Sequence, residues 1–219
     1  MKFESVIFDL DGTLLNTLDD LTDGVNYVLE KHGMPKRTLE EIRSFVGNGI
    51  PTLIKRAVKN GTDSAETEQC VKEMLSYYAE HCNIKTAPYD GIIDLLIQLK
   101  SCGIKICVVT NKDQTAAEEL CAEKFGGRLD YVVGAREGLA FKPAPDGVFL
   151  AMKSINANKE TTVYVGDSDV DMQTAENSGL KAIGVLWGFR NKADLEAYNP
   201  FGIAENAEKL AKIILNTEI

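Results

Sequence analysis

The chain has 219 residues, 44% of them hydrophobic and 26% charged, a composition typical of a soluble globular protein with one large domain or a core domain plus a smaller one. Its formal net charge of -9 argues against nucleic-acid and anionic-membrane partners, because both bind clustered Lys and Arg, but it allows a small anionic substrate. The first predicted strand begins close to Met1, no apolar run approaches the ~18 residues of a membrane span, and the five cysteines contain no Cys-x-x-Cys spacing. We therefore expect a cytoplasmic protein with reduced thiols.

The first predicted strand, residues 5–8, leads directly into two carboxylates. The apolar run is followed by Asp9 and Asp11, and Gly12-Thr13 then turns the chain away. Two neighbouring carboxylates at the end of a buried strand repel each other and resist desolvation. The pair therefore predicts a bound cation or a shared proton.

The next stretch, roughly 70 residues long, shows only helical periodicity. Helices are predicted over residues 18–32, 50–58 and 65–82, with a capping-box pattern from Thr38 to Glu41. Connections between neighbouring strands are usually short, so this block is better interpreted as an insertion. We expect a helical cap domain at residues 15–85 and a core domain formed by residues 1–14 and 86–219.

From residue 92 onward, predicted helices and strands alternate. The helices span residues 92–100, 114–124, 146–155, 169–177 and 205–215, and the strands span residues 104–110, 131–134, 162–166 and 181–185. Strict alternation indicates a parallel sheet covered by helices on both faces. The predicted fold class is α/β, a Rossmann-like doubly wound parallel sheet with an inserted all-helical cap.

The candidate site residues share one feature, which is that each lies at or beyond the end of a predicted strand. They are Asp9, Asp11, Thr110, Asn111, Lys142, Asp167 and Asp171. Open parallel sheets bind ligands beyond the carboxyl ends of their strands, so these side chains are expected to meet. Carboxylates, a hydroxyl and a lysine suit a hard cation together with a phosphate group.

Taken singly, these residues have simpler interpretations. Asp11 also fits a turn-stabilising role, Thr110 an ordinary strand end and Lys142 a surface loop. The spacing of carboxylates from Asp167 to Asp171 also suggests a calcium EF-hand. That alternative fails, because the sixth and twelfth loop positions would be Met172 and Ser178 where an EF-hand needs Gly and Glu.

Four ordered motifs resemble those of the haloacid dehalogenase superfamily across essentially the whole chain. They are Asp9-x-Asp11-Gly12-Thr13, Thr110-Asn111, Lys142-Pro143 and Gly166-Asp167-Ser168-x-x-Asp171. Three further stretches resemble its phosphoglycolate phosphatase group with a helical cap: residues 16–21, 46–49 and 185–189. Asn16, where that group commonly has an acidic residue, and Asp90, where it has proline, depart from the pattern without touching the expected chemistry.

The resemblance implies a magnesium-dependent phosphatase. Asp9 would be the nucleophile that becomes an aspartyl phosphate, and Asp11 would protonate the leaving alkoxide and then activate water. The implied Mg²⁺ ligands are the Asp9 carboxylate, the Asp11 backbone carbonyl and Asp167, supported by Asp171. Thr110, the amides near Asn111 and the Lys142 ammonium would bind the phosphoryl group.

Substrate recognition is expected from the cap. The Gly47-Asn48-Gly49 loop is the candidate contact, with Arg43, Lys55 or Arg56 as possible partners for a substrate carboxylate. The expected substrate is a small phosphorylated metabolite, first of all 2-phosphoglycolate, and the protein is expected to be a monomer or weak homodimer. Alternatives are a pyrophosphatase, a nucleotidase, a sugar-phosphate phosphatase, a β-phosphoglucomutase-like phosphotransferase, a phosphate-accepting signalling module and a catalytically silent binding protein.

Overall fold

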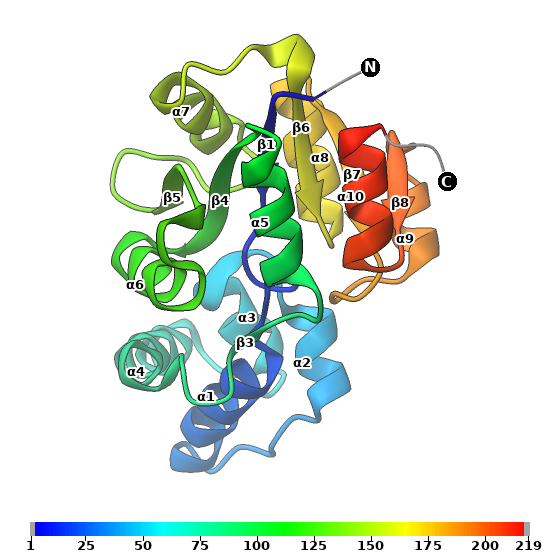
Figure 1. Ribbon diagram of the computed structural model, residues 1–219. Helices are drawn as coiled ribbons and strands as arrows, with labels where there is room; N and C mark the ends of the chain where they lie inside the picture. Colours follow the sequence, from blue (N-terminus) through cyan, green and yellow to red (C-terminus); the bar gives the residue numbers. More distant parts are fainter. Residues whose placement is uncertain (1–2, 217–219) are drawn as a thin grey trace. The chain divides into compact units, whose positions relative to one another are not determined.

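A computed structural model describes residues 3–216, and these form two compact units (Figure 1). The first unit comprises the chain up to Leu15 and again from Pro88 onward, and the second comprises Asn16–Ala87. Two short strands at the crossings between the units, β2 (Leu15–Asn16) and β3 (Ala87–Pro88), pair with each other. We describe each unit separately.

The first unit is built on a parallel sheet of six strands in the order β5-β4-β1-β6-β7-β8. The strands are β1 (Ser5–Phe8), β4 (Lys105–Asp113), β5 (Tyr131–Ala135), β6 (Thr162–Gly166), β7 (Lys181–Val185) and β8 (Gly202–Ala204). Central β1 pairs with β4 on one side and β6 on the other, with Phe8 opposite both Val108 and Val165. The strand order reverses between β1 and β6, and sheets of this kind bind ligands beyond the carboxyl ends of the strands at that point.

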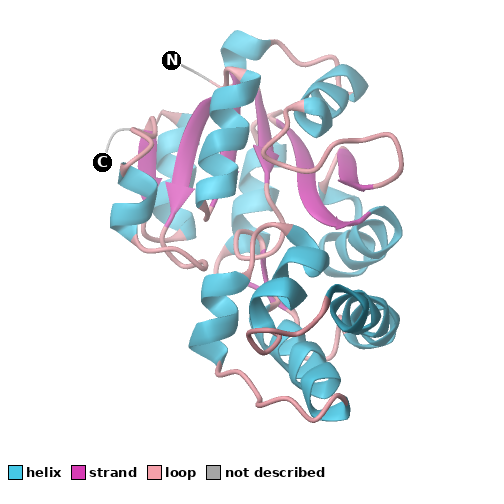
Figure 2. Cartoon of the chain, turned by 180° about the vertical axis from the view of Figure 1, so that it is seen from behind, coloured by secondary structure: helices cyan, strands magenta, loops and turns pink. Residues whose placement is uncertain are grey.

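Helices cover both faces of this sheet (Figures 1 and 2). Helices α5 (Ile92–Ser101) and α10 (Ala207–Leu215) pack together on one face, and α7 (Asp146–Ser154) and α8 (Asp169–Ser178) pack on the other. Connecting elements are α6 (Gln114–Phe125), α9 (Lys192–Glu196), η1 (Gly126–Arg128) and η2 (Lys159–Thr161). Because both faces are covered, every residue of β1 and β6 is buried.

The second unit consists of four helices: α1 (Leu18–Lys31), α2 (Leu39–Phe45), α3 (Gly49–Ala57) and α4 (Ser64–His81). α1 and α4 approach closely at Gly24, where an added Cβ would lie 2.8 Å from Met74 Cε. The buried Asp20 carboxylate accepts backbone N–H bonds from Ile84, Lys85 and Thr86, which ties the start of α1 to the returning chain.

The predicted fold class, a doubly wound parallel sheet with an inserted helical cap, is confirmed, and the differences concern short elements. β8 and α9, three and five residues long, were not predicted, because such short elements owe their form to pairing and packing with neighbours. β4 continues to Asp113, three residues beyond its predicted end, because its pairing with β5 is interrupted after Val109 and resumes between Asp113 and Ala135. Among residues 3–216, no helix combines the length and apolar character that crossing a bilayer requires.

Candidate active site

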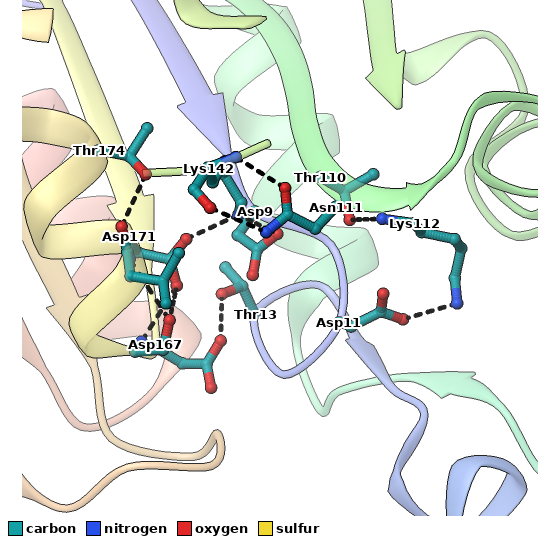
Figure 3. Close-up of polar contacts among 12 residues, drawn as sticks. Asp9, Asp11, Thr13, Thr110, Asn111, Lys112, Lys142, Asp167, Asp171 and Thr174 are labelled. Carbon is teal, nitrogen blue, oxygen red and sulfur yellow. Dashed lines mark hydrogen bonds and ion pairs between the residues drawn. The ribbon is translucent and has the colours of Figure 1, made fainter. Parts of the chain in front are cut away.

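The predicted core residues converge at the carboxyl ends of β1, β4 and β6 (Figure 3). Asp9 immediately follows β1, Thr110 and Asn111 lie in the last part of β4, and Asp167 immediately follows β6. Lys142 comes from the loop between β5 and α7 and points into this group. The structure thus brings together side chains that are far apart in the sequence.

Three carboxylates form the centre of the site. Asp9, Asp167 and Asp171 each offer an oxygen within 4.8 Å of the others, and all three are buried. Burial, with the charges of Asp171 and Asp167, raises the pKa of Asp9 well above its ordinary value, although Lys142 opposes the rise. Burial and the charge of Asp171 likewise raise the pKa of Asp167 to about 7. This cluster therefore has a strong electrostatic demand for a cation.

Lys142 meets part of that demand. Its Nζ lies 2.7 Å from Asp9 Oδ1 and 2.8 Å from Asp171 Oδ1, and it also donates to the Tyr164 hydroxyl at 3.2 Å. Burial alone would lower the pKa of Lys142, but the charges of Asp171 and Asp9 raise it well above its ordinary value. Lys142 is therefore a buried ammonium held between two carboxylates, and its simpler interpretation as a surface lysine is wrong.

Asn111 fixes the loop that carries this lysine. Its side-chain amide accepts from the Lys142 backbone N–H at 2.8 Å and donates to the Lys142 carbonyl at 3.2 Å. The neighbouring Thr110 is buried, and its Oγ1 accepts the Lys112 backbone N–H at 3.2 Å. The Asn111 side chain thus acts on the lysine loop, whereas the predicted role of nearby amides in phosphate binding stays a prediction.

Asp167 is held by two segments. Its Oδ1 accepts the Thr13 hydroxyl at 2.9 Å, and its Oδ2 accepts the Phe189 backbone N–H at 2.7 Å. The fit is tight, because a Cβ added at Gly188 would lie 2.3 Å from Asp167 Cβ and one at Gly12 would lie 2.5 Å from its Oδ2. Both glycines are therefore needed for close approach to this carboxylate.

Asp171 combines a structural and a site role. In the first turn of α8, its Oδ2 accepts from the Ser168 hydroxyl at 2.6 Å and from the Ser168 backbone N–H at 3.1 Å, completing a capping box. Its Oδ1 faces Lys142 and accepts the Tyr164 hydroxyl. Asp169 lies in the same first turn, as expected, and pairs with Arg190 at 3.1 Å.

The Asp11 side chain points away from the Asp9 side chain. Its Oδ1 lies 3.2 Å from the ammonium of Lys112, on the side away from the three-carboxylate cluster (Figure 3). The Lys112 side chain is only 5% exposed. Sequence reasoning did not single out Lys112, although it directly follows Thr110-Asn111.

The cap candidates gather around the turn between α2 and α3. Gly47 and Gly49 both have positive φ, at +120° and +79°, and Asn48 lies between them. Arg56 donates to the Phe45 carbonyl at 2.6 Å and to Asn48 Oδ1 at 3.0 Å. Arg43 lies 3.5 Å from Glu40. Arg56 thus braces this turn, and the part of all five residues in substrate binding stays a prediction.

The donor set fits a hard divalent cation. Asp9, Asp167 and Asp171 supply only oxygen atoms, and the described residues place no Cys or His in this cluster. Oxygen-only sites with several carboxylates favour Mg²⁺ or Ca²⁺ over softer metals. Burial first, and then the charge of Asp171, raises the pKa of both Asp9 and Asp167, and a bound divalent ion would favour their charged forms.

Comparison with known proteins agrees with this geometry. Residues 6–185 match the family model described as haloacid dehalogenase-like hydrolase. The chain is 32% identical over 211 residues to a phosphoglycolate phosphatase of Pseudomonas syringae pv. syringae, covering 94% of this chain and 77% of that protein. It is 30% identical over 199 residues to an N-acetylmuramic acid 6-phosphate phosphatase of Pseudomonas aeruginosa, covering 90% and 88%.

A solved structure is also similar over nearly the full length. The crystal structure of a protein from Lactobacillus delbrueckii subsp. bulgaricus, whose name gives phosphoglycolate phosphatase as an inferred function, superposes with a TM-score of 0.93 at 35% identity. The match covers 98% of this chain and 99% of that one. The chain therefore belongs to the haloacid dehalogenase-like hydrolases, and within them it is an enzyme of the phosphatase type. This assignment favours an enzyme over a signalling module or a silent binding protein.

Proposed function

We propose that this chain is a magnesium-dependent phosphomonoester hydrolase that acts through an aspartyl phosphate, with 2-phosphoglycolate as the first-choice substrate. The observation that carries the proposal is the buried cluster of Asp9, Asp167 and Asp171 bridged by the Lys142 ammonium. A carboxylate that attacks a phosphate dianion needs neutralising charge beside it. Here one cation is built into the chain and the carboxylates can hold a second.

In the first step, a carboxylate oxygen of Asp9 forms a bond to phosphorus while the bond from phosphorus to the leaving oxygen breaks. The Lys142 ammonium, 2.7 Å from Asp9 Oδ1, holds the nucleophile in place and balances negative charge on the phosphoryl oxygens. In the second step, water attacks phosphorus and the bond to Asp9 breaks, which releases inorganic phosphate. This division replaces one difficult displacement by two easier ones.

Asp11 is assigned the proton transfers. Its carboxylic acid would give a proton to the leaving alkoxide, and its carboxylate would then take a proton from the attacking water. The two aspartates thus divide the chemistry, because Asp9 forms the covalent bond and Asp11 moves the proton. Thr110 would bind a phosphoryl oxygen at the end of β4.

Mg²⁺ would be held by the carboxylates of Asp9 and Asp167 and the Asp11 backbone carbonyl, with Asp171 supporting. When bound, it would neutralise phosphate charge and favour the transition state electrostatically. The Thr13 hydroxyl and the Phe189 amide would orient Asp167 for metal binding, because each donates a hydrogen bond to one of its two carboxylate oxygens.

The substrate is the least constrained part of the proposal. The relative from Pseudomonas syringae supports 2-phosphoglycolate, whereas the similarly distant relative from Pseudomonas aeruginosa supports a bulkier sugar-acid phosphate. The Gly47-Asn48-Gly49 loop with Arg43 and Arg56 remains our candidate for the specificity element. We further propose a cytoplasmic monomer or weak homodimer.

The test is phosphate release from 2-phosphoglycolate, N-acetylmuramic acid 6-phosphate, pyrophosphate, nucleoside monophosphates and hexose phosphates, with Mg²⁺ or with EDTA. We expect preferential turnover of 2-phosphoglycolate, loss of activity in EDTA and no turnover by Asp9→Asn. Full activity of Asp9→Asn would disprove the proposed nucleophile, and undiminished turnover in EDTA would disprove the metal requirement. Phosphate release that required a sugar bisphosphate would favour the mutase alternative.

A further inference from the structure

Lys112 is a buried cation at the edge of the site to which the proposed mechanism gives no role. It follows Thr110 and Asn111 at the end of β4, and its side chain is 5% exposed. A lysine is rarely buried to this extent unless its charge is balanced. The carboxylate that the structure places opposite Lys112 Nζ is that of Asp11, with an N–O distance of 3.2 Å.

The local backbone explains how Lys112 reaches this position. The register between β4 and β5 is regular up to Val109 and resumes only at Asp113, so the intervening residues bulge away from the regular ladder. The Lys112 N–H donates to Thr110 Oγ1, which closes this bulge locally. Gly134 on β5 permits the close approach, since a Cβ there would lie 2.8 Å from the Lys112 carbonyl oxygen. The bulge thus gives Lys112 a defined direction.

The ion pair is also embedded in the protein. Asp11 Oδ1 is buried and accepts no hydrogen bond from the described residues, so its contact with Lys112 is an ion pair, and the Asp11 side chain as a whole is 22% exposed. Burial, followed by the charge of Asp11, raises the pKa of the Cys121 thiol to about 12, and Lys112 opposes that rise. The thiol on α6 therefore lies within electrostatic reach of both partners of the ion pair.

We propose that Lys112 is a positioning residue of the reaction, which orients the Asp11 side chain for proton transfer. Its ammonium binds Oδ1 and fixes the rotation of the carboxyl group, so that Oδ2 is the oxygen that exchanges the proton. This inference rests on the proposed function, because it assigns Lys112 a role only through Asp11. Lys112 and Lys142 thus serve different aspartates: Lys142 holds the nucleophile, and Lys112 holds the proton carrier.

The proposal predicts a dependence on the leaving group. An alkyl ester such as 2-phosphoglycolate must receive a proton from Asp11 when the bond between phosphorus and oxygen breaks. The nitrophenolate of p-nitrophenyl phosphate leaves without one. Loss of Lys112 should therefore slow phosphorylation of Asp9 by the alkyl ester and spare phosphorylation by the aryl ester. Hydrolysis of the aspartyl phosphate needs Asp11 for both substrates and should slow equally.

The experiment compares the wild type with Lys112→Met in rapid-quench assays with both esters. We expect Asp9 phosphorylation by 2-phosphoglycolate to fall at least about tenfold. With p-nitrophenyl phosphate we expect a burst of nitrophenolate at a nearly unchanged rate, followed by slow turnover. Lys105→Met, the same change at the opposite end of β4, is the matched control and should match the wild type in both assays. Thermal unfolding of each variant reports whether the fold is retained.

A double-variant cycle with Asp11→Asn separates positioning from general structural damage. If Lys112 acts through Asp11, adding Lys112→Met to Asp11→Asn should cause no further loss with the alkyl ester. Three results would each overturn the proposal: an equal loss in the rate of Asp9 phosphorylation with both esters, no loss in that rate with either ester, or multiplying losses in the double variant. If Lys112→Met does not fold, Lys112→Gln is used instead, and the same ratio of Asp9 phosphorylation rates, alkyl ester to aryl ester, is measured. Absence of turnover by the wild type on both esters would instead overturn the proposed function and this inference with it.

Discussion

The ammonium of Lys142 lies between Asp9 and Asp171, 2.7 Å from an oxygen of the first and 2.8 Å from an oxygen of the second. Asp9 directly follows the end of β1, Asp171 lies in the first turn of α8, and the lysine comes from the loop between β5 and α7. One buried cation therefore fixes the nucleophile relative to α8. Two carboxylates and an ammonium still leave the third carboxylate, Asp167, to be balanced by another cation.

The first prediction concerns this ammonium. Lys142→Met should lower kcat about 10² to 10³-fold, the usual cost of removing a charged or hydrogen-bonding group that stabilises the transition state. Lys142→Arg should not restore activity, because a planar guanidinium cannot replace a compact ammonium held between two carboxylates. Phosphate release at saturating Mg²⁺ measures both. Lys153→Met, at an exposed position on α7, is the control, and similar losses in the two methionine variants would contradict the role of Lys142.

The second prediction concerns pH and the metal-free protein. Burial and the charge of Asp171 raise the pKa of Asp167 from 3.8 to about 7, so the folded state binds a proton more tightly than the unfolded state. The resulting stability is fully present below pH 3.8 and is lost as pH rises through about 7. This group therefore lowers the free energy of unfolding by at most about 1.4 kcal/mol per pH unit within that window. Asp9, whose pKa is also raised, acts in the same direction.

Urea unfolding in EDTA between pH 5 and pH 8 measures this effect. Stability should fall with rising pH in the wild type and fall less steeply in Asp167→Asn, which has no carboxylate to ionise. Mg²⁺ should stabilise the protein most at the alkaline end, because the ion binds the deprotonated carboxylates. The same slope in the wild type and Asp167→Asn would show that Asp167 does not titrate in this range.

The arrangement of the strand ends follows from the sequence for a simple reason. Parallel strands alternating with helices bring all their carboxyl ends to one edge, so Asp9, Thr110 and Asp167 could be placed together from their positions alone. The motif Asp9-x-Asp11 also indicated the site, because two neighbouring carboxylates at the end of a buried strand repel each other and resist desolvation. These inferences needed only local periodicity and the general geometry of parallel sheets.

The contacts that orient the site residues could not be predicted from the periodicity of the sequence. The Phe189 N–H reaches Asp167 across 22 positions in the sequence, and Tyr164, an apolar-patterned strand residue, turns its hydroxyl toward Lys142. The direction of Lys112 depends on a bulge in β4 that a regular strand pattern does not reveal. Such contacts are set by tertiary packing, so they could be found only in the folded chain.

The third prediction tests the tight fit around Asp167. Gly188→Ala would place a methyl group 2.3 Å from Asp167 Cβ, so the carboxylate must shift from its bonds with Thr13 and Phe189. We expect the Mg²⁺ concentration for half-maximal activity to rise about 10 to 100-fold, as for other disturbances of residues that orient metal ligands. Gly127→Ala is the control, because no atom lies within 4 Å of its added Cβ. An unchanged Mg²⁺ dependence in Gly188→Ala would argue against Asp167 as a ligand.

The final prediction decides between two roles of Arg56. The guanidinium donates to the Phe45 carbonyl and to Asn48 Oδ1, so it holds the turn between α2 and α3. If bracing is its role, Arg56→Ala should raise KM for 2-phosphoglycolate and for ethyl phosphate, which lacks the carboxylate, by the same factor. If Arg56 binds the substrate carboxylate instead, KM should rise only for 2-phosphoglycolate, by about tenfold or more, because a charge-assisted hydrogen bond is lost.

The structure favours equal effects, because the Arg56 guanidinium donates its hydrogen bonds to the Phe45 carbonyl and Asn48 Oδ1, at the turn itself. Lys72→Ala removes an exposed cation on α4 and controls for the loss of positive charge in general. Steady-state kinetics with the two esters on both variants supply the comparison. A residue that only braces a turn cannot distinguish two esters by a single carboxylate. A rise in KM for 2-phosphoglycolate alone in Arg56→Ala would therefore show that Arg56 binds the substrate directly and does not merely support the Gly47-Asn48-Gly49 loop.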